Sequence, residues 1–116
     1  HTRWVVEAVG LSSAKEILMT ARRYSAEEAH RIGLVNHLVE SSEIEGFTIE
    51  YATTIVNNAP LSVLAAKAIA RQVSKISGDW DQELCSEWMK MCTSSQDYNE
   101  GRRAFMEKRL PKFTGV

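Results

Sequence analysis

The stretch DYNEGRRAFMEKRLPKF, residues 97–113, carries the most information about how this chain folds. Ser94 or Ser95 in front of it can cap a helix, because a serine hydroxyl accepts a hydrogen bond from a free backbone N–H of the first turn. Pro111 cannot continue a helix, since it lacks the backbone donor. The stretch therefore predicts a final helix that runs to about Arg109.

Three serine–glutamate pairs farther upstream have the spacing of a capping box, in which each side chain satisfies the other's free backbone N–H. They are Ser13 with Glu16, Ser25 with Glu28, and Ser42 with Glu45. The first pair predicts a helix that breaks near Thr20, and a further helix over Trp4–Val9 can precede it. The second pair predicts a short helix that ends at Gly33, because glycine readily takes the left-handed conformation of a C-cap.

Apolar residues downstream recur every three or four positions, which is the period of one helix face. They are Ile44, Phe47, Tyr51, Ala52 and Ile55 in one segment and Trp80, Leu84, Trp88 and Met91 in another. Between these segments, Pro60 suits the first position of a helix and Ser77–Gly78 end that helix. The apolar run at residues 34–39 indicates an extended segment. The sequence therefore predicts a mostly α chain with at most a short strand near residues 34–39.

The bulk composition excludes several classes of protein. The 116 residues fit one domain, and a net charge of −1 gives no indication of a nucleic-acid or membrane-surface partner. No apolar run reaches the length of a membrane span. Cys85 and Cys92 lie seven positions apart on one predicted helix, a separation of about 10 Å that is too long for a disulfide bond. No cysteine–histidine cluster has metal-ligand spacing, so no metal site is predicted.

Charge is unevenly distributed toward the end of the chain. Residues 79–100 carry six acidic side chains against Lys90, whereas residues 101–116 carry five basic side chains against Glu107. The charges can form a solvated helix face, the two segments can pair with each other, or the basic segment can meet an anionic ligand. The sequence alone leaves both interpretations open.

Three blocks of residues stand in a specific order along the chain. They are Val9-Gly10-x-x-x-Ala14-Lys15-Glu16-Ile17-Leu18, then Ser25-Ala26-Glu27-Glu28-Ala29 through Gly33-Leu34-Val35-Asn36, then Asp97-x-x-Glu100-Gly101-x-x-Ala104-Phe105-x-Glu107-Lys108-Arg109-x-Pro111-x-Phe113, with Ala59-Pro60 and Lys67 between them. Together they resemble the crotonase superfamily of enoyl-CoA hydratases and isomerases. The resemblance implies a spiral ββα core followed by a helical region that builds trimers or dimers of trimers. It places residues 1–40 at the end of the core with its linking helices, and residues 41–116 in the C-terminal helical oligomerisation region.

The resemblance also implies a function. The parent protein is expected to act on an acyl-CoA thioester, most simply as a 2-enoyl-CoA hydratase that stabilises an enolate in an oxyanion hole. Isomerases, decarboxylases and hydrolases share these blocks, and a non-catalytic helical assembly module is the alternative for this chain alone. The oxyanion hole and the catalytic glutamates are expected upstream of His1, so no residue of this chain is expected to be catalytic. Coenzyme A is expected as part of the substrate, without a separate cofactor, in a homo-oligomer of the cytoplasm or, in a eukaryote, the mitochondrial matrix.

Phe105 and Lys108 are the candidate binding residues. Three positions apart on the predicted helix, they would share a face, where a ring can stack on an adenine and an ammonium can meet its phosphate. In the family this pair reaches the CoA of the neighbouring subunit, and the resemblance implies the same role here. The alternative is that Phe105 is a core anchor and Lys108 a solvated charge. His30 and His37 have no catalytic partner at motif spacing.

Overall fold

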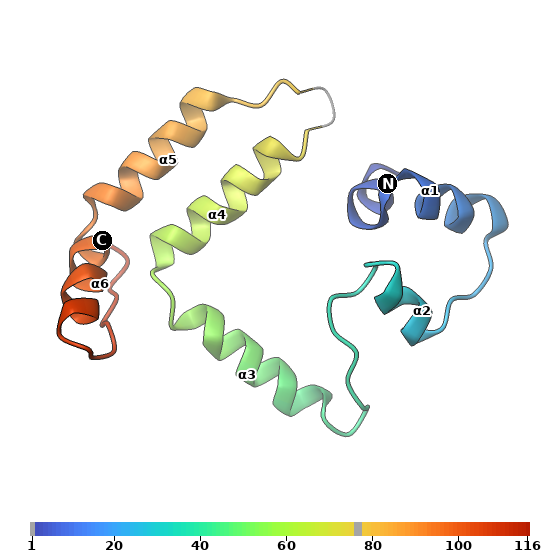
Figure 1. The fold of residues 1–116 in the computed structure, drawn as a ribbon, viewed down its shortest axis with the longest axis horizontal. Coiled ribbons are helices and arrows are strands. Elements are labelled where there is room, and N and C mark those ends of the chain that lie inside the picture. The colour runs from blue at the N-terminus through green and yellow to red at the C-terminus, as the bar shows by residue number, and fades with distance from the viewer. Residues whose placement is uncertain (1, 76–77) are drawn as a thin grey trace. The chain divides into compact units, whose positions relative to one another are not determined.

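The computed structural model describes residues 2–75 and 78–116, and within them the chain forms six helices and no strand (Figure 1). The helices are α1 (Thr2–Thr20), α2 (Ala26–Arg31), α3 (Ile44–Val56), α4 (Pro60–Val73), α5 (Gln82–Ser94) and α6 (Gln96–Met106). The mostly α prediction is confirmed, and residues 34–39 form bends and irregular backbone. In the same described ranges, no helix combines the length and the apolar composition that crossing a bilayer requires.

The chain divides into two compact units, His1–Phe47 and Thr48–Val116. The first unit holds α1, α2 and the beginning of α3, and the second holds the rest of α3 with α4, α5 and α6. The domain boundary between residues 40 and 41, which the resemblance implies, stays a prediction.

A kink at Gly10 divides α1. This residue has φ +74° and ψ 168°, a conformation that glycine adopts without the steric cost that a Cβ would add. The helix expected over Trp4–Val9 and the helix expected after it are therefore both present and meet at this glycine. The capping box predicted at Ser13 is wrong, because Ser13 lies inside α1 and the carboxylate of Glu16 instead accepts hydrogen bonds from Arg22.

The capping box predicted at Ser25 is confirmed. Ser25 Oγ accepts a hydrogen bond of 3.2 Å from the backbone N–H of Glu28, and Glu28 Oε2 accepts one of 3.0 Å from the backbone N–H of Ser25. Gly33, with φ +79°, follows the end of α2 as predicted, and the N–H of Leu34 donates to the carbonyl of Ala29 at 2.8 Å. These bonds fix both ends of a six-residue helix that is too short to persist alone.

Arg22 links the two helices of the first unit. Its guanidinium donates to Glu16 of α1 at 3.1 Å and to Glu28 of α2 at 3.0 Å. The same group lies 3.7 Å from the ring centroid of Tyr24, close enough for a cation–π contact. One side chain therefore ties the end of α1 to the start of α2.

In the second unit, α4 packs along α5, and α5 packs against α6 (Figure 1). α4 begins at Pro60 as predicted, whereas the break predicted at Ser77–Gly78 falls partly outside the described residues. α5 begins after its N-cap Asp81, whose Oδ1 accepts a hydrogen bond of 2.8 Å from a backbone N–H of the first turn. Cys85 and Cys92 of α5 are free thiols, in agreement with their predicted separation.

Few apolar side chains are buried in the described part of the chain. The buried apolar residues are Ala14, Ala65, Cys85 and Ala104, and no large side chain there is fully buried. No residue of α3 is buried, and its Ile49 and Val56 are 61% and 77% exposed. Burying one large apolar side chain contributes about 1.5–3 kcal/mol, so these open faces favour association with further protein surface.

Candidate functional site

The last helix, α6, begins where the sequence predicts and ends earlier. Ser95 is its N-cap, and its Oγ accepts a hydrogen bond of 3.0 Å from the backbone N–H of Tyr98. The predicted end near Arg109 is wrong, because the helix stops at Met106. The residues beyond Met106 therefore belong to a turn and an irregular tail, which together carry much of the basic segment.

Lys108 closes the end of α6 in a left-handed conformation, with φ +53°. Its N–H donates to the carbonyl of Phe105 at 3.2 Å, and the N–H of Arg109 donates to the carbonyl of Ala104 at 3.0 Å. These are the two hydrogen bonds of a Schellman motif. The premise that Phe105 and Lys108 share a face of one helix is therefore wrong: Phe105 lies in the last turn of α6, and Lys108 lies in the turn beyond it.

Phe105 is 82% exposed, so its interpretation as a core anchor is wrong for this chain. It lines an open groove of about 370 Å³. The other residues that line the groove are Ala59, Ser62, Asp97, Tyr98, Gly101, Arg102 and Phe113. The guanidinium carbon of Arg102 lies 5.8 Å from the ring centroid of Tyr98. The groove thus offers aromatic faces and a cation, the groups that recognise a flat ring carrying negative charge. Among the described residues that line the groove, Lys108 is absent.

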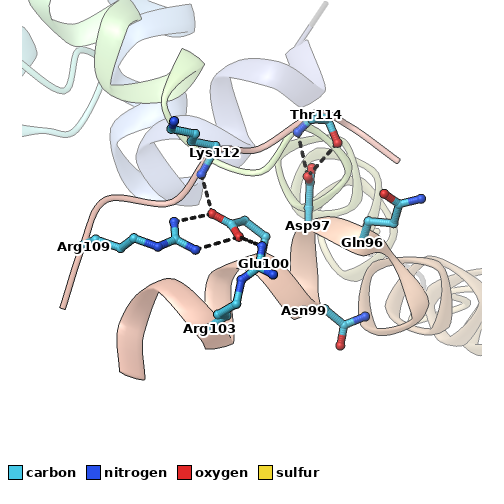
Figure 2. Close-up of a pocket in the computed structure, with 8 residues that line it drawn as sticks. All are labelled: Gln96, Asp97, Asn99, Glu100, Arg103, Arg109, Lys112 and Thr114. Atoms are coloured by element: carbon cyan, nitrogen blue, oxygen red, sulfur yellow. Dashed lines mark hydrogen bonds and ion pairs between the residues drawn. The ribbon is translucent and has the colours of Figure 1, made fainter. Parts of the chain in front are cut away.

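Glu100 lies at the centre of a neighbouring polar cluster (Figure 2). Its Oε1 and Oε2 accept hydrogen bonds of 2.6 and 2.9 Å from the two terminal nitrogens of Arg109. Oε2 also accepts one of 2.6 Å from Arg103, and Oε1 accepts one of 2.9 Å from the backbone N–H of Lys112. The side chain of Glu100 is only 11% exposed. This cluster is an internal clamp that joins α6 to the chain beyond it.

The clamp shifts the acidity of both partners. The hydrogen bonds from Arg109, and then those from Arg103 and Lys112, hold the pKa of Glu100 well below its usual range. The hydrogen bonds to Glu100 and Glu107 raise the pKa of Arg109 above its ordinary value. The interpretation in which acidic and basic segments pair with each other is therefore confirmed for Arg103 and Arg109.

Asp97 holds the C-terminal tail, residues 110–116. Its Oδ1 accepts a hydrogen bond of 2.7 Å from the backbone N–H of Thr114, and its Oδ2 accepts one of 2.8 Å from that of Gly115. The carbonyl of Val116 in turn accepts a hydrogen bond of 3.2 Å from the backbone N–H of Asp97. Because Asp97 is only 2% exposed, these tail contacts are shielded from water.

The roles of Asp97 and Glu100 are the part of this site that sequence analysis misses. Their spacing of three places both on one face of α6, and this was the available signal. Their partners lie in an irregular tail whose path no periodicity predicts.

The histidines lie elsewhere and have local contacts. The carbonyl of His30 accepts a hydrogen bond of 3.0 Å from the N–H of Gly33. The ring of His37 lies 5.2 Å from that of Phe47, centroid to centroid. Within residues 2–75 and 78–116, no three His, Cys, Asp or Glu side chains are placed to hold a metal ion.

The helices of the described residues and the ordered motifs are those of a C-terminal helical part of the crotonase fold. The chain belongs to the enoyl-CoA hydratase/isomerase family, whose model it matches over residues 1–116.

Known proteins similar to this chain differ in their reactions. A short-chain-enoyl-CoA hydratase from Clostridium acetobutylicum is 37% identical over 108 residues, 93% of this chain and 41% of the relative. A methylmalonyl-CoA decarboxylase from Escherichia coli is 35% identical over 109 residues, 91% of this chain and 41% of the relative. The crystal structure of an enoyl-CoA hydratase from Bacillus anthracis superposes with a TM-score of 0.82 at 32% identity, covering 99% of this chain and 45% of that one. The chain thus spans about two fifths of the length of the curated relatives it matches.

Proposed function

We propose that this chain is the C-terminal helical part of an enzyme that processes acyl-CoA thioesters, most simply a 2-enoyl-CoA hydratase. The observation that carries the proposal is the family match over the whole of residues 1–116. Two relatives support the proposal, because each is named for a reaction of a CoA thioester. One is a hydratase and the other is a decarboxylase. Since these two reactions differ, the likeness supports the substrate class more strongly than the reaction.

The chemistry proposed for the complete enzyme requires a polarised thioester carbonyl. Two aimed N–H donors stabilise the enolate oxygen, and carboxylates move the protons. We place these groups in the part of the relatives that this chain does not span. No residue of this chain is proposed as catalytic, and coenzyme A enters as part of the substrate without a separate cofactor.

Phe105 and Lys108 are proposed to bind the CoA held by a neighbouring subunit. Phe105 offers an exposed ring in a groove that also contains Tyr98 and Arg102. Lys108, one residue past the cap of α6, supplies an ammonium for the phosphate. The structure changes the geometry of this proposal: the two side chains come from a helix end and the following turn, rather than from one helix face.

A second proposal is that this chain serves assembly rather than catalysis. Its support is the exposed apolar surface of α3, where Ile49, Ile55 and Val56 are 61%, 46% and 77% exposed. A neighbouring subunit or the rest of the parent protein would cover such a surface in a homo-oligomer. The two proposals are compatible if the surface of α3 forms the oligomer in which Phe105 reaches the CoA bound by a neighbouring subunit.

Assaying hydration of crotonyl-CoA tests the two proposals together. The complete protein should consume the conjugated thioester, and the 116-residue chain alone should not exceed a control without protein. Turnover by the chain alone would contradict the assembly proposal. If the complete protein releases carbon dioxide from a malonyl-type thioester and leaves crotonyl-CoA unchanged, the proposed reaction changes from hydration to decarboxylation.

A further inference from the structure

The backbone at Lys108 is unusual for its residue type. The position that follows a helix C-cap in a Schellman motif is most often glycine, because the left-handed conformation brings a Cβ close to the backbone. Lys108 takes this conformation at φ +53° although it carries a long side chain. A strained backbone of this kind persists only where the surrounding structure holds it.

Two acidic side chains provide that restraint through Arg109. Glu107 and Arg109 flank Lys108 and pair across it, with Arg109 Nε donating to Glu107 Oε2 at 2.6 Å. Glu100 binds the other edge of the same guanidinium through two hydrogen bonds. A bidentate guanidinium–carboxylate pair fixes direction as well as distance, so the residue after Lys108 is anchored to the face of α6.

The ammonium of Lys108 takes no part in the ion pairs that form the clamp. The ion pairs of this segment, within the described residues, are those of Arg103 and Arg109 with Glu100 and Glu107. Lys108 takes part in none of them, and it is exposed. The turn therefore presents an exposed ammonium, whereas the guanidinium groups of Arg103 and Arg109 are paired with carboxylates.

We propose that Glu100, acting through Arg109, is a positioning residue for Lys108: the clamp holds the left-handed turn that points the ammonium at the phosphate of CoA. The inference rests on the proposed CoA role of Lys108 and adds to it the device that orients the side chain. If the inference holds, the affinity for CoA depends on the carboxylate of Glu100, although this group has the same sign of charge as the ligand.

Glu100→Gln in the complete protein separates positioning from a simple charge effect. Neutralising a carboxylate adds positive potential, so charge alone predicts tighter binding of CoA. Positioning predicts binding that is weaker by about threefold, because the neutral amide has one acceptor oxygen and cannot hold both terminal nitrogens of Arg109. Dephospho-CoA, which lacks the phosphate that Lys108 would meet, should change much less. Tighter or unchanged CoA binding would overturn the inference.

A double-mutant cycle with Lys108→Ala shows whether Glu100 acts through Lys108. If it does, Glu100→Gln should have no further effect on CoA affinity once the ammonium is gone. An equal loss in both backgrounds would mean that Glu100 acts by another route, and would overturn the positioning role.

Hydrogen exchange gives a readout that is independent of CoA. In Glu100→Gln the amides of Lys108 and Arg109 should exchange faster, while Arg103→Ala, which removes a partner of Glu100 inside the helix, should leave them nearly unchanged. Unchanged exchange in Glu100→Gln would overturn the clamp itself. Faster exchange without any effect of Lys108→Ala on CoA would instead overturn the proposed CoA contact, and the positioning role with it.

Discussion

The carboxylate of Asp97 accepts a hydrogen bond of 2.7 Å from the backbone N–H of Thr114, seventeen residues later in the chain. The tail is thus held by a residue that lies in the first turn of α6 and is only 2% exposed. Asp97→Ala should lower the free energy of unfolding by about 1.5–3 kcal/mol, because buried backbone donors lose a charged acceptor. Urea unfolding followed by circular dichroism measures this loss.

Asp97→Asn is the matched control. It keeps the size of the side chain and one acceptor oxygen, so its loss of stability should be clearly smaller than that of Asp97→Ala. Equal stability of the wild type and Asp97→Ala would mean that the tail contributes nothing to the fold.

The Glu100 clamp predicts a dependence of stability on pH. The pKa of Glu100 is lower in the folded chain than in the unfolded chain, so the unfolded state takes up the proton first as pH falls. The stabilisation is therefore complete above about pH 4.3, the unfolded value for a glutamate, and is lost progressively below it. The difference in unfolding free energy between the wild type and Glu100→Gln should shrink as the solution is acidified below that pH. A difference that stays constant from neutral pH to strong acid would contradict the clamp.

Ser25 caps α2 with both halves of the capping box in place. Ser25→Ala should cost about 1 kcal/mol of stability. Ser13→Ala is the matched control, because Ser13 lies inside α1, where alanine is at least as good a helix former as serine. Thermal unfolding of the two variants should separate them, and equal losses would indicate that Ser13 caps a helix after all.

Lys108→Ala tests the proposed contact with CoA. In the complete protein it should weaken CoA binding by about fivefold or less, because an exposed ion pair contributes at most about 1 kcal/mol. Dephospho-CoA should be affected much less. Calorimetry that finds the same loss for both ligands, or for neither, would leave Lys108 as a solvated charge.

Association of the 116-residue chain tests the exposed surface of α3. Ile55 is 46% exposed on the face that the periodicity predicts, so sedimentation at high concentration should reveal a dimer, trimer or larger assembly. Ile55→Lys should shift this equilibrium toward the monomer, because it places a charge in the apolar surface. A wild-type chain that sediments as a clean monomer would argue against the assembly proposal.

Helix starts could be predicted because they depend on neighbouring residues. Ser25 and Ser95 cap helices through hydrogen bonds to backbone groups three positions away, and Pro60 fits the first turn by its own geometry. Ser13 has the same local pattern and fails, because the kink falls at Gly10 and the helix already runs past the serine. A capping motif therefore indicates a start only where the preceding residues leave the helix.

The end of α6 and the contacts of the tail could not be predicted in the same way. Lys108 adopts a conformation that its residue type disfavours, and it does so because Arg109 is held by Glu100, nine residues earlier. The exposure of Phe105 likewise depends on which neighbours cover it and not on its spacing. The motif in residues 97–113 predicts Phe105 and Lys108 as candidate binding residues, but the spatial relation between them depends on contacts that no helical period encodes.

The clamp also bears on the order in which the second unit forms. The hydrogen bonds of Glu100 and Asp97 close loops of nine residues, between Glu100 and Arg109, to eighteen residues, between Asp97 and Gly115. Closing short loops costs little entropy, and contacts of low sequence separation form quickly. We therefore expect α6 and the tail to assemble early as a local nucleus. The packing of α4 along α5, and any pairing with a second subunit, would then take place after the turn at Lys108 has formed.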